Sequence, residues 1–108
     1  MTLETDFIAV LKYRTHLEDG RKDYALSGYR PDIKFSFSEM RTCGVQTFVG
    51  QEKVFPGESV TANIKITATE FFKGQLYENL EFDFSEGLNI IGTGIILEII
   101  NPILKIKI

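Results

Sequence analysis

The chain has 108 residues and a formal net charge of −3, and 44% of its residues are hydrophobic. This length and composition predict a single globular domain over residues 1–108 and exclude a disordered chain. The net charge excludes a strongly basic nucleic-acid module, although it is compatible with a local basic patch. One cysteine excludes a disulfide framework within the chain, and one cysteine with one histidine cannot form the usual four-ligand zinc site.

The N-terminal residues predict a protein without a targeting segment. Met1–Asp6 contains neither a basic region nor an apolar core, so we expect no secretory signal. The longest apolar stretch, Ile95–Ile100, is interrupted by Glu98 and is far shorter than the roughly 20 residues of a membrane span. The sequence therefore predicts a cytoplasmic protein without a membrane partner, in which Cys43 is a reduced, packed thiol.

Alternation of apolar and polar residues predicts most of the strands. In chain order, the candidate strands are residues 7–13, 33–38, 45–49, 60–69 and 80–85. The 60–69 strand has the clearest pattern, and its expected core positions are Val60, Ala62, Ile64, Ile66 and Ala68. The expected core positions of the second strand are Ile33, Phe35 and Phe37.

The C-terminal third is denser in isoleucine. Residues 90–100 are typical of a strand that is buried on both faces or that crosses a barrel. Pro102 ends this strand because proline lacks an amide hydrogen for the sheet. Residues 101–108 then predict an extra strand or tail, whose apolar positions are Leu104, Ile106 and Ile108. Together with the intervening turns, about six strands predict an all-β fold, a small antiparallel barrel or sandwich.

No motif in the chain indicates catalysis. The sequence contains neither a phosphate-binding glycine loop nor a dinucleotide fingerprint, and Gly92-Thr93-Gly94 lies inside an apolar strand, where we interpret it as a site of close backbone approach. His16 precedes the turn at residues 18–20, so we interpret it as a solvated loop residue. We therefore predict a non-enzymatic chain with no cofactor, no metal and no bound GTP.

Charge is distributed unevenly along the chain. Residues 1–41 contain seven basic and seven acidic side chains, whereas residues 52–98 contain three basic and eight acidic ones. No lysine or arginine lies between Gly74 and Leu104, so we expect that part of the surface to repel phosphate. An anion-binding patch would have to come from the N-terminal third, where the cations include Lys12, Arg14, Arg21, Lys22, Arg30 and Lys34. The candidate basic patch is Arg21, Lys22 and Lys34.

Three segments carry a resemblance to a known family. The first comprises Gly20-Arg21, Ser27-Gly28-Tyr29-Arg30-Pro31 and Phe35; the second is Phe55-Pro56-Gly57-Glu58; the third is residues 82–96. In order and spacing, over about residues 6–100, they resemble the C-terminal, third domain of translation elongation factor Tu. The resemblance implies a six-stranded antiparallel barrel that stands alone, without the family's GTPase and middle domains.

The resemblance also implies functional residues. In that family the third domain contacts aminoacyl-tRNA, the GTPase domain and the nucleotide-exchange factor. By this resemblance, Arg30, Glu86 and Gly87 are candidate RNA-binding residues. Ser85 and Asn89 stand where the family has two arginines, and this loss of charge weakens phosphate binding.

Two functions follow from these observations. We favour a non-catalytic protein-interaction barrel, acting through a protein partner or through self-association. For the tail residues Leu104, Ile106 and Ile108, three roles are open: closing the protomer's own barrel, pairing with a second copy, or extending a partner's sheet. The alternative is a tRNA- or RNA-binding module that acts in translation.

Overall fold

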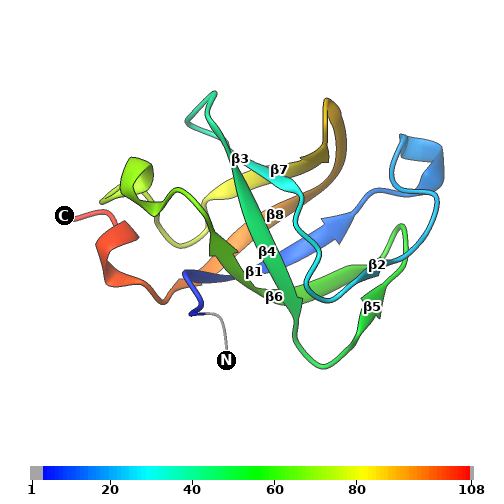
Figure 1. The fold of residues 1–108 in the computed structure, drawn as a ribbon, viewed down its shortest axis with the longest axis horizontal. Coiled ribbons are helices and arrows are strands. Elements are labelled where there is room, and N and C mark those ends of the chain that lie inside the picture. The colour runs from blue at the N-terminus through cyan, green and yellow to red at the C-terminus, as the bar shows by residue number, and fades with distance from the viewer. Residues whose placement is uncertain (1–3, 108) are drawn as a thin grey trace.

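The strands form a closed antiparallel barrel of six strands (Figure 1). The computed structural model describes residues 4–107. In order around the wall, the barrel consists of β1 (Phe7–Tyr13), β6 (Ser59–Ile66), β4 (Arg41–Phe48), β3 (Asp32–Phe35), β7 (Glu81–Glu86) and β8 (Asn89–Ile99). The predicted all-β, six-stranded antiparallel barrel is therefore confirmed.

Two short strands and several 3-10 turns lie outside the six barrel strands. The strands β2 (Ala25–Leu26) and β5 (Lys53–Val54) pair with each other in a separate two-stranded sheet. Three 3-10 turns lie between or after the strands: η1 (His16–Glu18), η2 (Thr69–Phe72) and η3 (Pro102–Leu104). Among residues 4–107, no helix is long and apolar enough to cross a membrane.

Alternate residues of each barrel strand point into an aromatic core. In β6 the buried residues are Val60, Ala62, Ile64 and Ile66, as predicted. The strand ends at Ile66, however, and Ala68 instead precedes the η2 turn as its N-cap. The rings of Phe7, Phe35 and Phe82 meet edge to face at the centre of the core, with centroids 5.8–6.0 Å apart.

Two expectations about exposure are wrong. Phe37 is 46% exposed because β3 ends at Phe35 and the chain turns, with the Ser38 amide donating to the Phe35 carbonyl. The strand β8 is not buried on both faces: Ile95 and Leu97 are 42% and 46% exposed. The reason is that the outer side of a single-layered barrel wall faces solvent, so only alternate residues reach the core.

The glycines of β8 make room mainly for core rings, whereas the sequence predicted a close approach of backbone. Only Gly92 also shows the predicted approach, since a Cβ atom there would lie 2.7 Å from the Lys12 carbonyl oxygen. A Cβ atom at Gly92 would lie 2.2 Å from the ring of Phe84, and one at Gly94 would lie 2.3 Å from the ring of Phe82. Both distances are shorter than any side chain tolerates, so these two positions require glycine.

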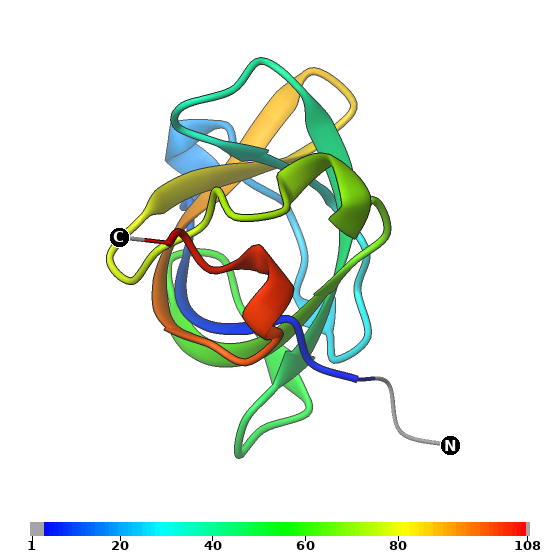
Figure 2. The same ribbon diagram turned by 90° about the vertical axis from the view of Figure 1, so that its left-hand side faces the viewer.

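The tail closes one end of the barrel (Figure 2). It is not an alternating strand: η3 buries Leu104 completely, whereas Ile106 is 42% exposed and Ile108 lies outside the described residues. The Leu76 amide donates to the Leu104 carbonyl over 2.8 Å, and the Ile106 amide donates to the Leu76 carbonyl over 2.8 Å. Of the three roles considered for the tail, the structure shows the first, in which it closes the protomer's own barrel.

Candidate functional site

Parts of the segments that carry the resemblance, including the turn between β7 and β8, lie at the end of the barrel remote from the tail (Figure 1). We call residues 14–31, 49–58 and 86–89 the loop end. Local hydrogen bonds order its first loop, because the Thr15 hydroxyl accepts from the Glu18 amide and the Glu18 carboxylate accepts from the Thr15 amide. Hydrogen bonds from the backbone amide and from the side chain of Thr15 to the carboxylate lower the pKa of Glu18. His16 is exposed on this turn, as predicted.

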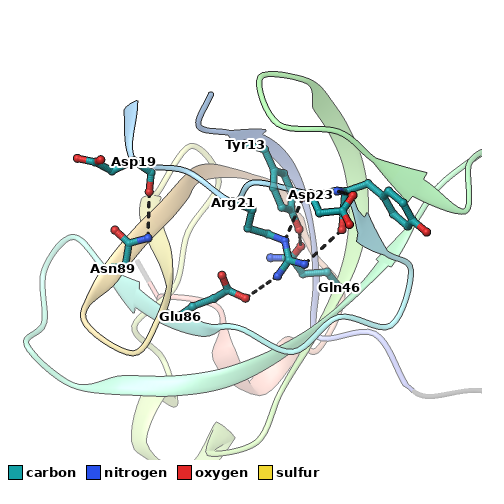
Figure 3. A network of polar contacts seen from close by, with 8 residues as sticks. Tyr13, Asp19, Arg21, Asp23, Gln46, Glu86 and Asn89 are labelled. Atoms are coloured by element: carbon teal, nitrogen blue, oxygen red, sulfur yellow. Dashed lines mark hydrogen bonds and ion pairs between the residues drawn. The ribbon is translucent and has the colours of Figure 1, made fainter. Parts of the chain in front are cut away.

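Arg21 is the centre of a polar network at the loop end (Figure 3). Its guanidinium pairs with the carboxylate of Glu86 at 2.5 Å and donates to the backbone carbonyls of Asp23 and Tyr24 at 3.3 and 3.2 Å. The same guanidinium lies 4.8 Å from the ring centroid of Tyr29. Arg21 and Glu86 therefore neutralise each other, and the guanidinium is already satisfied by protein groups.

A second pair of polar side chains lies beneath this network. The Tyr13 hydroxyl donates to Oε1 of Gln46 at 2.5 Å, and both residues are buried. The Nε2 atom of Gln46 has no hydrogen-bond partner among residues 4–107. Burial raises the pKa of Tyr13, and burial together with the nearby Glu86 carboxylate raises the pKa of Tyr29. Both phenols therefore stay neutral at physiological pH.

A hollow of about 460 Å³ opens beside the network. It is lined by Arg21 and by the consecutive residues 23–29. Gly28, at φ +98°, provides a backbone conformation that other residues rarely adopt. Two hydrogen bonds to β4 then fix the loop, since the Gly28 amide donates to the Gln46 carbonyl and the Gln46 amide donates to the Tyr29 carbonyl.

Two leucines project from neighbouring loop tips. Leu17 on η1 is 93% exposed, and Leu88 in the β7–β8 turn is 95% exposed. The side-chain amide of Asn89 donates to the Asp19 carbonyl at 2.9 Å and so ties the two loops together (Figure 3). Sequence reasoning missed both leucines because a single apolar residue in a turn produces no periodic pattern.

The structure places the candidate RNA-binding residues at the loop end. Arg30 is exposed and forms no ion pair within the described residues, and its carbonyl accepts a weak bond from the Cys43 thiol at 3.7 Å. Glu86 is held by Arg21, and Gly87 forms the β7–β8 turn at φ +60°. The three residues therefore share one end of the molecule, but only Arg30 has an unpaired charge.

The members of the candidate basic patch line three different hollows. Arg21 lines the hollow described above, and Lys22 lines a smaller one of about 250 Å³ beside Asn89. Lys34 lines a third hollow, of about 260 Å³, on the outer wall together with Glu81 and Asp83. The three side chains are thus dispersed, and each lies beside an acidic residue: Arg21 beside Glu86, Lys22 beside Asp19, and Lys34 beside Glu81 and Asp83.

Sequence reasoning also missed the role of Arg41. Its Nη1 atom donates to the hydroxyl of Ser85 at 2.9 Å, and Ser85 is only 1% exposed. Arg41 therefore brings a cation from β4 to the residue that precedes Glu86 in β7, which no local motif could indicate.

The sequence matches no protein-family model. Within residues 4–107, no group of three or more histidine, cysteine, aspartate or glutamate side chains is arranged to hold a metal ion. The features that distinguish the loop end are therefore its exposed leucines, its neutralised arginine and its hollow.

Proposed function

We propose that this chain is a non-catalytic protein-interaction barrel related to the third domain of elongation factor Tu, and that the loop end is its binding surface. The observation that carries the proposal is the pair of leucines, Leu17 and Leu88, exposed by more than nine-tenths on loops that are tied together. Burying a leucine side chain contributes about 2 kcal/mol, so a protein partner that covers both gains substantially.

The side chains beside the leucines support a protein partner. Tyrosine and arginine are enriched among the residues that dominate binding energy in protein interfaces. Arg21, Tyr24 and Tyr29 all line the adjacent hollow. The Arg21–Glu86 pair holds the hollow in shape before any partner arrives, which reduces the entropic cost of binding.

The same network disfavours RNA as the partner. Affinity for RNA comes mainly from cations that neutralise phosphates. Glu86 already neutralises Arg21, and Lys34 lies beside two carboxylates. At the loop end, the tRNA alternative therefore depends on the cations that form no ion pair within residues 4–107, which are Arg14, Lys22, Arg30 and Lys53.

The resemblance suggests the first partners to test. In the family that the chain resembles, this domain contacts a GTPase domain and an exchange factor. We therefore propose that the partner belongs to the translation machinery, and that translation GTPases with the other two domains are the first candidates.

The test is site-specific photo-crosslinking with purified elongation factor Tu from the same organism. We expect a crosslink from a photoreactive residue at position 88 and none from one at position 97, since Leu97 is similarly apolar and 46% exposed but lies far along β8. A second assay titrates the chain into fluorescent tRNA, with a scrambled RNA as control.

The two assays distinguish the protein proposal from the RNA alternative. The protein proposal predicts a crosslink at position 88 and no tRNA binding at physiological salt. Saturable tRNA binding that Arg30→Ala abolishes would replace it with the RNA alternative. Equal crosslinking at positions 88 and 97 would remove the loop end as the binding surface.

A further inference from the structure

The end of the barrel that the tail closes presents a second surface, opposite the loop end (Figure 2). We call three segments the closed end: residues 36–40, 69–78 and 102–107. Two of them are joined by backbone bonds, since the Gly74 amide donates to the Ile103 carbonyl at 2.9 Å. The first segment adjoins η2 through the core, because the ring of Phe35 contacts both Phe37 and Phe72, with centroids 6.0 and 5.1 Å apart. The three segments therefore lie side by side.

The closed end exposes many large apolar side chains. Six of them are 41–57% exposed, namely Phe37, Met40, Phe71, Tyr77, Ile103 and Ile106. Since a fully exposed side chain of this size presents about 200 Å², the six together present about 500 Å² of apolar surface. The largest apolar patch on a monomeric protein is typically about 300–600 Å² and often has a function.

This area matches the requirement of a stable pair of proteins. In an interface of standard size, each partner buries about 800 Å², of which about 60% is apolar. The six side chains therefore supply about the whole apolar share of such an interface, and the charged residues of the same segments supply a polar rim.

The charges of the closed end cancel one another. Its segments contain three lysines and three glutamates: Lys73, Lys105, Lys107, Glu39, Glu70 and Glu78. Lys105 pairs with Glu78 at 3.8 Å, and the other four are exposed and form no ion pair within the described part of the chain. Two lysines and two glutamates are thus free to pair when the same face meets itself across a two-fold axis. Because the face as a whole is neutral, it does not repel its own copy.

We infer that the chain pairs with a second copy of itself through the closed end, about a two-fold axis. The two loop ends then point away from each other, because each lies at the end of its barrel remote from the tail. The pair therefore presents two binding surfaces and can hold two partner molecules at once. The residues of the closed end differ from those of the loop end, so the pairing stands independently of the proposed function.

The test is sedimentation equilibrium of the full-length chain from about 1 μM to about 1 mM, a range that covers weak and strong association. We expect the molar mass to rise from that of one copy to that of two and to stop there. Phe71→Glu and Ile103→Glu each place a charge among the apolar side chains, and each is expected to raise the dissociation constant about 10-fold or more. The matched control is Leu97→Glu, at a leucine of β8 that is 46% exposed, which should associate like the parent.

Leu88→Glu, at the loop end, is the second control and should also leave the mass at two copies. A mass of one copy at every concentration would overturn the inference. A mass that rises beyond two copies would also overturn it, because unlike faces would then be in contact. A pair that both closed-end variants leave intact, or that Leu88→Glu dissociates, would place the interface elsewhere. Circular dichroism verifies that the variants are folded.

The photo-crosslink from position 88 reports the proposed function separately. A chain that stays single but still crosslinks to its partner from position 88 would remove only the pairing. A chain that pairs through the closed end but gives no crosslink would remove only the proposed function.

Discussion

At the scale of single residues, Asp6 joins three distant parts of the chain. Its carboxylate, only 1% exposed, accepts from the Ile66 amide and from the Asn101 side-chain amide, each at 2.9 Å. Lys65 lies 3.3 Å from the same carboxylate. The carbonyl of Asp6 also accepts from the amides of Ile100 and Asn101. One residue thus anchors the start of β1 to β6 and to the segment before η3.

We expect Asp6→Ala to lower the free energy of unfolding by about 3 kcal/mol, because it leaves the buried Ile66 amide without a partner and Asn101 with one bond fewer. Asn101→Ala should lower it by about 1–2 kcal/mol, since it removes the bond to Asp6 and the N-cap bond that Asn101 Oδ1 accepts from the Ile103 amide. Urea unfolding measures both values, with the exposed Glu98→Ala as the control. Equal effects for Asp6→Ala and Glu98→Ala would show that the network does not stabilise the barrel.

The buried phenol of Tyr13 is expected to lower the free energy of unfolding at alkaline pH. Burial raises its pKa above the ordinary value of 10, so in the folded state the phenol stays neutral where it ionises in the unfolded chain. The resulting stability is fully present below pH 10 and is lost as the pH rises toward the folded-state pKa. Above pH 10, we expect the free energy of unfolding to fall by up to about 1.4 kcal/mol per pH unit from this group.

The measurement is urea unfolding at several pH values between 9 and 12. Tyr13→Phe should flatten the decline, although it lowers the stability at neutral pH by about 1 kcal/mol because Gln46 loses its donor. Tyr77→Phe, at a side chain that is 41% exposed, is the matched control and should keep the parent's slope. An unchanged slope in Tyr13→Phe would assign the alkaline sensitivity to another group.

At the scale of elements, the sequence predicted those strands in which one face is buried. The alternation in residues 60–69 located β6, because packing against one core fixes a period of two. The two-residue strands β2 and β5 are too short to produce a period, so their pairing depends on long-range contacts. The sequence likewise indicated Arg21 and Glu86 only as separate candidates, because their pairing depends on long-range contacts. The fold shows that they neutralise each other.

In the tail, the alternation of apolar and polar residues does not correspond to a strand. Leu104 and Ile106 suggested one face of a strand, yet η3 rotates Leu104 into the barrel and leaves Ile106 at the surface. We expect Leu104→Ala to lower the free energy of unfolding by about 2–4 kcal/mol, because it creates a cavity in the closed end. Ile106→Ala should change it by less than about 1 kcal/mol. Urea unfolding compares the two variants.

The same pair of variants tests the tail as an interface between copies. Because Leu104 packs in its own barrel, its loss should leave the molar mass in light scattering unchanged at concentrations where the variant is folded. A lower mass for Ile106→Ala than for the parent would instead show that the exposed side of the tail joins two copies.

At the scale of the whole molecule, charge decides between the two classes of partner. The wall formed by β7 and β8 contains four acidic residues and no lysine or arginine, and the acidic residues are Glu81, Asp83, Glu86 and Glu98. The cations of the N-terminal third are dispersed over separate hollows, and the central one is paired with Glu86. From this distribution and the net charge of −3, we expect the molecule to attract RNA only weakly.

Glu86→Gln distinguishes the two functions, because they predict opposite changes in the affinity for tRNA. If Glu86 contacts tRNA, as the resemblance implies, the substitution lowers the affinity for tRNA. If Glu86 serves to neutralise Arg21, the substitution frees one cation, and we expect the weak low-salt affinity to rise about 2-fold to 5-fold, with a salt dependence steeper by about one phosphate contact. Fluorescence anisotropy with labelled tRNA at several salt concentrations measures both quantities. Because the amide oxygen that Glu86→Gln introduces can still accept a hydrogen bond from Arg21, the loop remains ordered and the change in affinity reports the charge alone.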